Sequence, residues 1–310
     1  MNRNSHRLAV LALAMLVTPV QADDVLSLEQ LSEAFGWDFE KTEITIETRE
    51  EGFHVLFGIG GNIAVSIGAD GTLLVDDQFP QMMPKVDKAL ASLGSDGVDF
   101  AVNTHWHFDH AEGNLILGPR GVWLVSQANS RAMMADPHVI NLVMWQYRQN
   151  PYPESARPVI TYDDRMQFHF NGEQIDLLHF GPAHTTGDTA VIFRGRNAVH
   201  LGDVFNNSGY PFIDADNGGS ISGMIEFCSE VRDEINEDTT VIPGHGLITD
   251  YRALVDYIDM LTVVRDRIVG MIEDGKSLEA VIAATPTVEF DERYGDPGMM
   301  VDRAYASLSR

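Results

Sequence analysis

Three of the eleven histidines in this chain fall within the short run His105-Trp106-His107-Phe108-Asp109-His110. The run follows residues 99–103 (DFAVN), which we expect to form a β-strand. His105 and His107, two residues apart at the end of that strand, then point the same way, and Asp109 and His110 belong to the turn that follows. Imidazoles and a carboxylate this close together suit zinc or a similar cation, because without a metal they would crowd partly charged groups.

Three further signals lie at the ends of expected strands downstream. They are His184 in the Gly/Pro-bounded turn 180–188 (FGPAHTTGD), Asp203 at the end of 199–203 (VHLGD), and His245 between glycines in 241–246 (VIPGHG). Each alone is compatible with an ordinary turn histidine or a capping aspartate. Together, and in this order, they favour a set of metal ligands gathered at strand ends, where α/β folds place their sites.

The rest of the chain mixes strand and helix signals. The expected strands are 53–57, 63–67, 72–76, 158–161, 166–170, 175–180, 189–193 and 197–201, and the expected helices are 80–93, 127–135, 139–148 and 251–274. Because strands outnumber crossover helices, this α/β pattern favours two mixed sheets with helices outside over one doubly wound parallel sheet. Residues 23–310 contain no repeat, low-complexity tract or linker, and we expect them to form one domain.

The N-terminus has the composition of a secretory signal peptide. Arg3 and Arg7 precede the apolar run Leu8–Val17, and Val20-Gln21-Ala22 has small residues at the positions that a cleavage site requires. The apolar run is too short to span a bilayer. We expect residues 1–22 to be removed and the mature protein to be periplasmic or secreted, with no membrane anchor. A buried N-terminal helix is the alternative, which the acidic pair that follows Ala22 disfavours.

Charge and cysteine content narrow the partners. The formal net charge is −25, with 46 acidic against 21 basic side chains, so the surface repels nucleic-acid phosphates and anionic lipids. This balance indicates that nucleic acid is not a partner, and we expect a small-molecule substrate instead. Cys228 is the only cysteine and cannot form an intramolecular disulfide. It falls in an expected helix, where a buried core residue is favoured over a metal ligand.

The HxHxDH run, the turn histidine, the strand-end aspartate and the PGHG histidine together resemble the metallo-β-lactamase-fold hydrolases. The resemblance covers nearly the whole mature chain and implies an αββα sandwich with metals at one edge of its two sheets. It implies two zinc ions, one held by His105, His107 and His184, the other by Asp109, His110 and His245, with Asp203 between them. It also implies that Asp76, at the end of the 72–76 strand, braces the site.

The expected reaction follows from two cations that share a water, which then ionises near neutral pH and attacks a carbonyl. Asp109 is the residue expected to orient that hydroxide and accept a proton. The sequence therefore predicts an exported zinc hydrolase acting on an amide, ester or lactone, with a β-lactam as one candidate. Residues 203–210 contain no lysine to hold a drug carboxylate, which weakens that candidate. The alternative is a periplasmic metal-binding protein or sensor without turnover.

Overall fold

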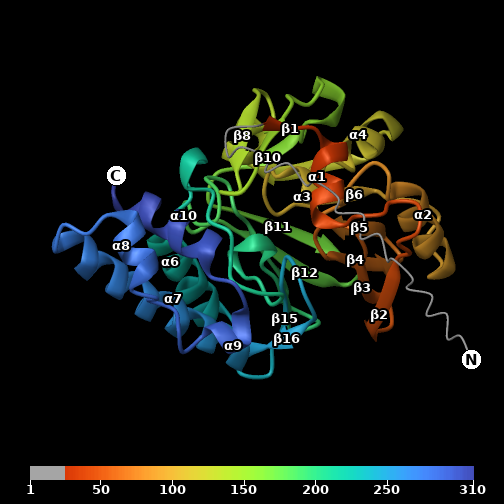
Figure 1. Cartoon of the computed structure of the whole chain (residues 1–310). Helices are drawn as coiled ribbons and strands as arrows, with labels where there is room; N and C mark the ends of the chain where they lie inside the picture. The colour runs from red at the N-terminus through yellow and green to blue at the C-terminus, as the bar shows by residue number, and fades with distance from the viewer. Residues whose placement is uncertain (1–24) are drawn as a thin grey trace, which may run out of the picture.

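Two large β-sheets pack face to face at the centre of the molecule, with helices on both outer sides (Figure 1). This arrangement is seen in a computed structural model that describes residues 25–310. It confirms the αββα sandwich expected from the sequence. The predicted signal peptide lies outside the described residues.

The first sheet has seven strands in the order β10-β7-β6-β5-β4-β3-β2. Its strands are β2 (Thr45–Glu50), β3 (Phe53–Phe57), β4 (Ile63–Gly68), β5 (Gly71–Val75), β6 (Phe100–Asn103), β7 (Trp123–Gln127) and β10 (Ile160–Tyr162). Strands β2 to β5 form an antiparallel meander, of which the sequence predicted β3, β4 and β5 but not β2. Strands β5, β6, β7 and β10 run parallel. The carboxyl ends of β5 and β6 therefore lie at the same edge.

The second sheet has six strands in the order β11-β12-β13-β14-β15-β16. They are β11 (Arg165–Phe170), β12 (Glu173–Leu178), β13 (Ala190–Phe193), β14 (Ala198–His200), β15 (Thr240–Ile242) and β16 (Thr249–Asp250). All neighbours pair antiparallel except β14 and β15. The turn Asn171-Gly172 joins β11 to β12 with both φ angles positive, at 52° and 79°, as a two-residue hairpin requires.

The main core lies between the two sheets. Val55, Val75 and Val102 of the first sheet pack with Leu177 and Phe193 of the second, and all are fully buried. Because helices cover the outer faces as well, strands such as β3 are buried on both sides. This explains why the sequence shows continuous apolar runs there rather than alternation.

The outer helices divide between the two sheets. Helix α2 (Met83–Ser92) packs on the first sheet, and α6 (Ile221–Glu234), α7 (Tyr251–Glu273) and α10 (Gly298–Leu308) cover the second (Figure 1). The remaining short helices are α3 (Phe108–Ala111), α4 (Asn114–Leu117), η1 (Gly118–Arg120), η2 (Glu154–Ala156), η3 (Gly202–Val204), η4 (Ala215–Asn217), α8 (Leu278–Ala283) and α9 (Asp291–Tyr294). Within residues 25–310, none of the helices has the length and apolar character needed to cross a membrane.

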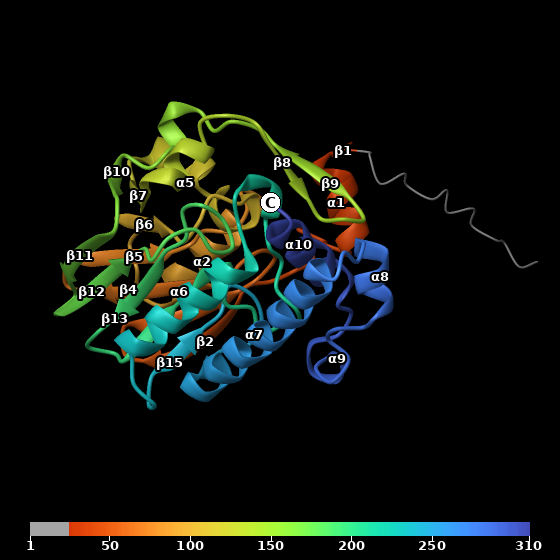
Figure 2. The same cartoon turned by 90° about the vertical axis from the view of Figure 1, so that its left-hand side faces the viewer.

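Residues 139–148, expected to form a helix, instead form most of a β-hairpin. Strands β8 (His138–Asn141) and β9 (Gln146–Gln149) pair antiparallel, and β1 (Val25–Leu26) adds parallel to β9. Val143 adopts a φ of 67° in the connecting turn, which a helix cannot contain. The hairpin lies beside α1 (Leu28–Phe35) at one end of the sandwich (Figure 2). The helix expected near 127–135 is confirmed as α5 (Ala128–Met133).

Candidate metal centre

The HxHxDH run lies at the carboxyl end of β6, as the sequence predicted. The strand ends at Asn103 and the chain bends at Thr104 and His105; His107 is extended, with φ −63° and ψ 149°, and the first turn of α3 begins at the next residue. His105 and His107 therefore lie in the link between β6 and α3, whereas Asp109 and His110 project from α3. One short stretch of chain thus supplies side chains in two directions.

The first group of donor atoms consists of His105, His107 and His184, all buried, with one ligand atom from each within 4.8 Å of the others. His184 comes from the loop between β12 and β13, so the group joins the two sheets. Nε2 of His184 lies 2.9 Å from Nδ1 of His107. Nε2 of His105 is buried and has no hydrogen-bond partner in the described part of the chain.

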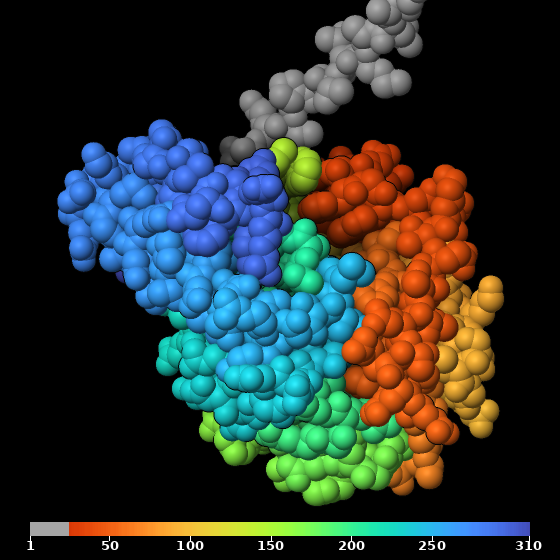
Figure 3. All heavy atoms as spheres, turned by 90° about the horizontal axis from the view of Figure 1, so that it is seen from below, coloured from red at the N-terminus to blue at the C-terminus, as the bar shows by residue number. Residues whose placement is uncertain are grey.

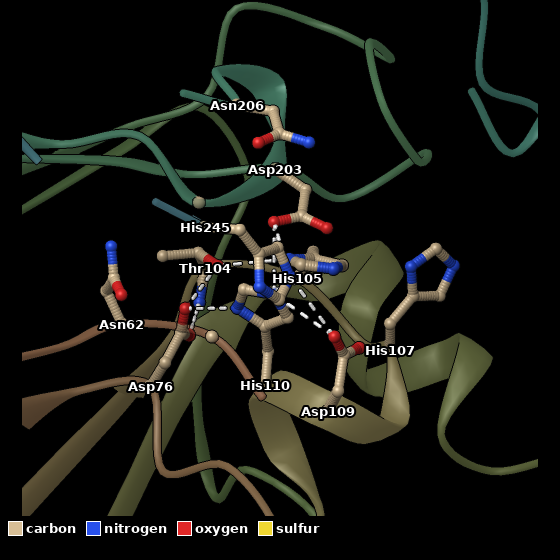
Figure 4. Close-up of polar contacts among 12 residues, drawn as sticks. Asn62, Asp76, Thr104, His105, His107, Asp109, His110, Asp203, Asn206 and His245 are labelled. Carbon is tan, nitrogen blue, oxygen red and sulfur yellow. Dashed lines mark hydrogen bonds and ion pairs between the residues drawn. The ribbon is translucent and has the colours of Figure 1, made fainter. Parts of the chain in front are cut away.

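The second group consists of Asp109, His110, Asp203 and His245, also within 4.8 Å of one another. Nε2 of His110 lies 3.1 Å from Nε2 of His245 and 3.1 Å from Oδ1 of Asp203. Oδ2 of Asp109 lies 3.2 Å from Nε2 of His245. Figure 4 shows these four side chains pointing toward one another from α3, η3 and the loop after β15.

Asp203 lies between the two groups. Its Oδ1 faces the second group, and its Oδ2 lies 3.8 Å from Nε2 of His184 in the first. A carboxylate with one oxygen toward each group has the geometry of a bridging ligand.

Polar groups behind the histidines fix their rings. The pairs are His105 Nδ1 with Thr104 Oγ1 at 3.0 Å, His107 Nε2 with Asp214 Oδ2 at 2.9 Å, His110 Nδ1 with Asp76 Oδ2 at 2.7 Å, and His184 Nδ1 with the Phe212 carbonyl at 2.9 Å. The Thr104 hydroxyl donates its only proton to Asp76, so it must accept from Nδ1 of His105. The other nitrogen of His105 therefore keeps a free lone pair that faces the centre.

Asp76 and Asn62 support the centre from the first sheet. Oδ1 of Asp76 accepts from the backbone N–H of Thr104 at 2.7 Å, and Asp76 itself adopts a left-handed φ of 65° at the end of β5. Such a backbone is held only where the surroundings enforce it. Asn62 donates to the carbonyls of Pro243 and Gly246 on either side of His245, at 2.9 and 2.8 Å. Asp76 is fully buried, so it acts on the centre through Thr104 and His110.

The local electrostatics favour metal-binding protonation states at Asp203 and His105. At His110 and His245 burial opposes the charged form, but Asp203 and Asp109 raise the pKa of both rings, that of His245 to about 10, so these rings must release a proton to bind a cation. Burial opposes the charge of Asp203, yet His245 and His110 together hold the pKa of its carboxyl well below the ordinary value. Burial, and then the neighbouring His110, holds the pKa of His105 well below that of a free imidazole. A carboxylate and a neutral imidazole are the forms that coordinate a divalent cation. The unpaired nitrogen of His105 and the two convergent groups therefore fit a pair of such cations.

The sequence profile of the metallo-beta-lactamase superfamily matches residues 60–257, a stretch that contains every residue of both groups. The chain belongs to the metallo-β-lactamase superfamily. None of the curated protein sequences matches it.

Solved structures of the same fold include enzymes with different substrates in their names. A metallo-β-lactamase from Pontibacter korlensis aligns with a TM-score of 0.59 and 15% identity over 71% of this chain and 99% of its own. The DIM-1 metallo-β-lactamase aligns with a TM-score of 0.57 and 16% identity over 72% of this chain and 99% of its own. The stereoselective inverting sec-alkylsulfatase Pisa1 from Pseudomonas sp. aligns with a TM-score of 0.66 and 12% identity over 84% of this chain and 50% of its own. At these identities the likeness shows the shared metallo-β-lactamase fold alone.

The structure brings together all seven residues that the sequence singled out as ligands of a metallo-β-lactamase centre. Neither group includes Cys228, which is buried in α6 with its thiol 3.5 Å from the Val204 carbonyl. Sequence reasoning missed Asp214, which contacts His107. The local sequence around Asp214 indicates only an N-cap of the short helix η4. In that role its side chain accepts a hydrogen bond from the backbone N–H of Asn217. Nothing in that pattern points to a histidine 107 residues earlier.

A pocket of about 310 Å³ opens over this candidate metal centre. His107, Asp109, Asp203 and His245 line its floor. Its walls come from four segments far apart in the sequence, namely the end of α1, the β8–β9 hairpin, the loop before η4, and α10. Figure 3 shows the red N-terminal, yellow-green, teal and blue C-terminal segments meeting on one face. A substrate bound there would contact the centre directly.

Proposed function

We propose that this chain is an exported zinc hydrolase that cleaves an amide, ester or lactone bond in a small-molecule substrate. The observation that carries the proposal is the position of Asp203, whose two oxygens face the two groups of donor atoms. Two cation sites joined by one carboxylate are the arrangement that hydrolytic dinuclear centres use. Membership of a superfamily whose members are usually metal-dependent hydrolases supports the same reaction class.

The donor set supports zinc. Both groups consist of imidazole nitrogens and carboxylate oxygens, a combination that zinc binds readily. His105, His107 and His184 would hold one ion, Asp109, His110 and His245 the other, and Asp203 would bridge them. Zinc held there supplies a nucleophile from water near neutral pH and polarises the bond under attack.

The protein groups around the centre have separate roles in this reaction. Asp109 lines the pocket with its carboxylate partly exposed, so it can orient the attacking water and accept a proton. Thr104, Asp76 and Asp214 hold the histidine rings in the orientation that leaves one nitrogen of each facing the centre.

Export rests on the N-terminal sequence alone. Arg3, Arg7, the apolar run and the Val20-Gln21-Ala22 end form a leader that is cleaved before Asp23 in this proposal. A periplasmic or secreted enzyme would take up zinc outside the cytoplasm.

The similar solved structures are named as metallo-β-lactamases and as an alkylsulfatase. The bond that this chain cleaves must therefore be assigned by experiment. A β-lactam is disfavoured because the pocket lining contains no lysine or arginine to pair with the carboxylate of the drug. The experiment is metal analysis of the purified protein coupled to hydrolysis assays on β-lactams, lactones, carboxylic esters, thioesters, phosphodiesters and a sec-alkyl sulfate. Zinc-dependent turnover of an ester, amide or lactone is expected. Tightly bound zinc without turnover of any compound would support a metal-binding protein instead.

A further inference from the structure

The walls of the pocket over the centre are mainly apolar and partly open to solvent. Phe35, Trp37, Leu142, Phe212 and Met299 supply most of the apolar surface, and Asn206, Ser208 and Tyr210 add uncharged polar side chains. Phe35 is 45% exposed although it is a large aromatic residue. Exposed apolar surface that lines a concave site is a common mark of ligand binding, because an apolar ligand removes that surface from water.

The aromatic part of the pocket wall packs against further aromatic residues that are buried. The ring of Phe35 stacks on Trp37 with centroids 4.8 Å apart and planes 14° apart. Trp37 in turn contacts Phe79 and Phe108, with centroids 5.4 and 6.4 Å away. Phe79 is fully buried, so these rings belong to a packed cluster and the wall is formed before any ligand binds. A preformed wall lowers the cost of ordering on binding.

The charged groups of the pocket all lie at its floor. Asp109 and Asp203 are the only acidic residues in its lining, and both belong to the candidate metal centre. The lining contains no lysine or arginine. The Ser208 hydroxyl already donates to Asn206 and the Tyr210 hydroxyl to Asp291. A negative charge held against the walls would therefore lose its hydration without gaining a cationic partner. A positive charge would find aromatic faces there, but it would lie close to the divalent cations bound at the floor.

We propose that the substrate carries an uncharged apolar group on the side of its scissile bond that enters this pocket. The reacting bond lies at the floor, and the apolar group extends along the apolar part of the wall, which Phe35, Trp37, Leu142, Phe212 and Met299 form. This inference rests on the proposed hydrolytic function, and it names the class of substrate that the function leaves open. The volume of about 310 Å³ is at the low end of ligand sites, which fits a small ester or lactone with a short aliphatic or aromatic substituent.

The experiment compares nitrophenyl esters of matched length with the zinc-loaded protein. The acyl chain ends in a methyl group in the hexanoate, in a carboxylate in the adipate half-ester, and in a trimethylammonium group in a third ester. We expect kcat/KM for the hexanoate to exceed that for both charged esters by about tenfold or more. From acetate to hexanoate, kcat/KM should rise by up to about fourfold for each methylene that becomes buried. Equal rates, or a preference for either charged ester, would overturn the proposal.

Two variants of the hairpin turn separate the pocket from long-range charge effects. Leu142→Lys places an ammonium group in the pocket wall, whereas Met144→Lys adds the same charge two residues away at a side chain that is 66% exposed and does not line the pocket. Leu142→Lys should lower kcat/KM for the hexanoate. It should also lower the ratio of kcat/KM for the hexanoate to kcat/KM for the adipate half-ester by about tenfold. Met144→Lys should leave the ratio unchanged, and both variants should keep the zinc content of the parent. An equal change of this ratio in the two variants would contradict a role for the pocket wall.

A binding measurement tests the pocket without turnover. Octanol should bind the zinc-loaded parent and Met144→Lys, and bind Leu142→Lys more weakly, as detected by ligand-observed NMR. If esters and lactones are not cleaved and octanol still binds in this pattern, the proposed reaction fails while the apolar pocket stands. If esters are cleaved with no preference for the uncharged chain, the reaction stands and the pocket assignment fails.

Discussion

Oδ2 of Asp214 lies 2.9 Å from Nε2 of His107, on the ring edge opposite the Nδ1 that faces His184. The backbone N–H of Asp214 also donates to the carbonyl of His184, at 3.1 Å. One residue thus fixes a histidine side chain from the first sheet and the main chain of a histidine from the second. Because the carboxylate is 1% exposed, its charge acts on His107 with little screening by water.

Asp214→Asn should weaken zinc binding at the first group by about 10–100-fold, because a neutral amide orients and polarises the His107 ring less than a carboxylate does. Competition with a chromogenic chelator measures this loss. Asp216→Asn is the matched control, because that carboxylate lies two residues away and pairs on the surface with Arg303 and Arg310. Unchanged zinc affinity in the Asp214 variant would show that this contact does not support the centre.

The two groups should be separable by metal analysis. The double variant His105→Ala with His107→Ala removes two of the three donors of the first group and should empty it, while Asp109→Asn should mainly disturb the second. Elemental analysis of the folded proteins should therefore show a zinc content lower than that of the parent in both variants. Active parent protein that contains no metal, or that works only with redox-active iron, would refute the zinc assignment.

Asp203 should matter far more for hydrolysis than Cys228. Asp203→Asn keeps the size of the side chain but removes the negative charge between the groups, so we expect activity to fall by at least about 10–100-fold. Cys228→Ser should cost some stability and leave the zinc content unchanged, because the thiol is buried in the core. Burial also raises the pKa of the Cys228 thiol, so the folded protein should not react with a thiol reagent at mildly alkaline pH. Loss of zinc in the Cys228 variant would reverse this assignment.

Two glycines next to the centre should not tolerate a side chain. A Cβ at Gly244 would overlap Oδ1 of Asp203, and a Cβ at Gly61 would overlap the ring of His110. We expect Gly244→Ala and Gly61→Ala to displace these side chains and to lower zinc affinity at the second group by about tenfold or more. Gly270→Ala in α7 is the control, since a Cβ there has open space and the change should stabilise the helix by up to about 1 kcal/mol. Full zinc binding in both site variants would show that the centre can shift without loss.

The leader prediction can be checked directly. N-terminal sequencing of the native protein should return Asp23 as the first residue, and cell fractionation should place the protein outside the cytoplasm. A protein that begins at Met1 or Asn2 would show that the leader is retained.

The residues that gather in the two groups of donor atoms were predictable from the sequence because they follow strand ends within short local motifs. His105, Asp203 and His245 each follow a β-rich run, and the sandwich topology then brings those ends to one edge. Residues 139–148 were predicted wrongly as a helix, because nothing in their sequence signals the left-handed turn at Val143, and β9 also pairs with β1, more than a hundred residues earlier. Asp214 was missed for the same reason, since its partner His107 is remote in sequence. Local pattern contains no information about such contacts.

The pocket walls include residues outside the stretch that matches the superfamily. Residues 60–257 hold both groups of donor atoms, whereas Phe35, Trp37 and Met299 lie before and after that stretch. Part of the pocket wall thus comes from segments outside the stretch that carries the donor atoms. Terminal segments exchanged between relatives of this fold would alter that part of the wall and leave the donor groups in place. Shared ancestry within the superfamily therefore constrains the candidate metal centre more tightly than it constrains the shape of the pocket above it.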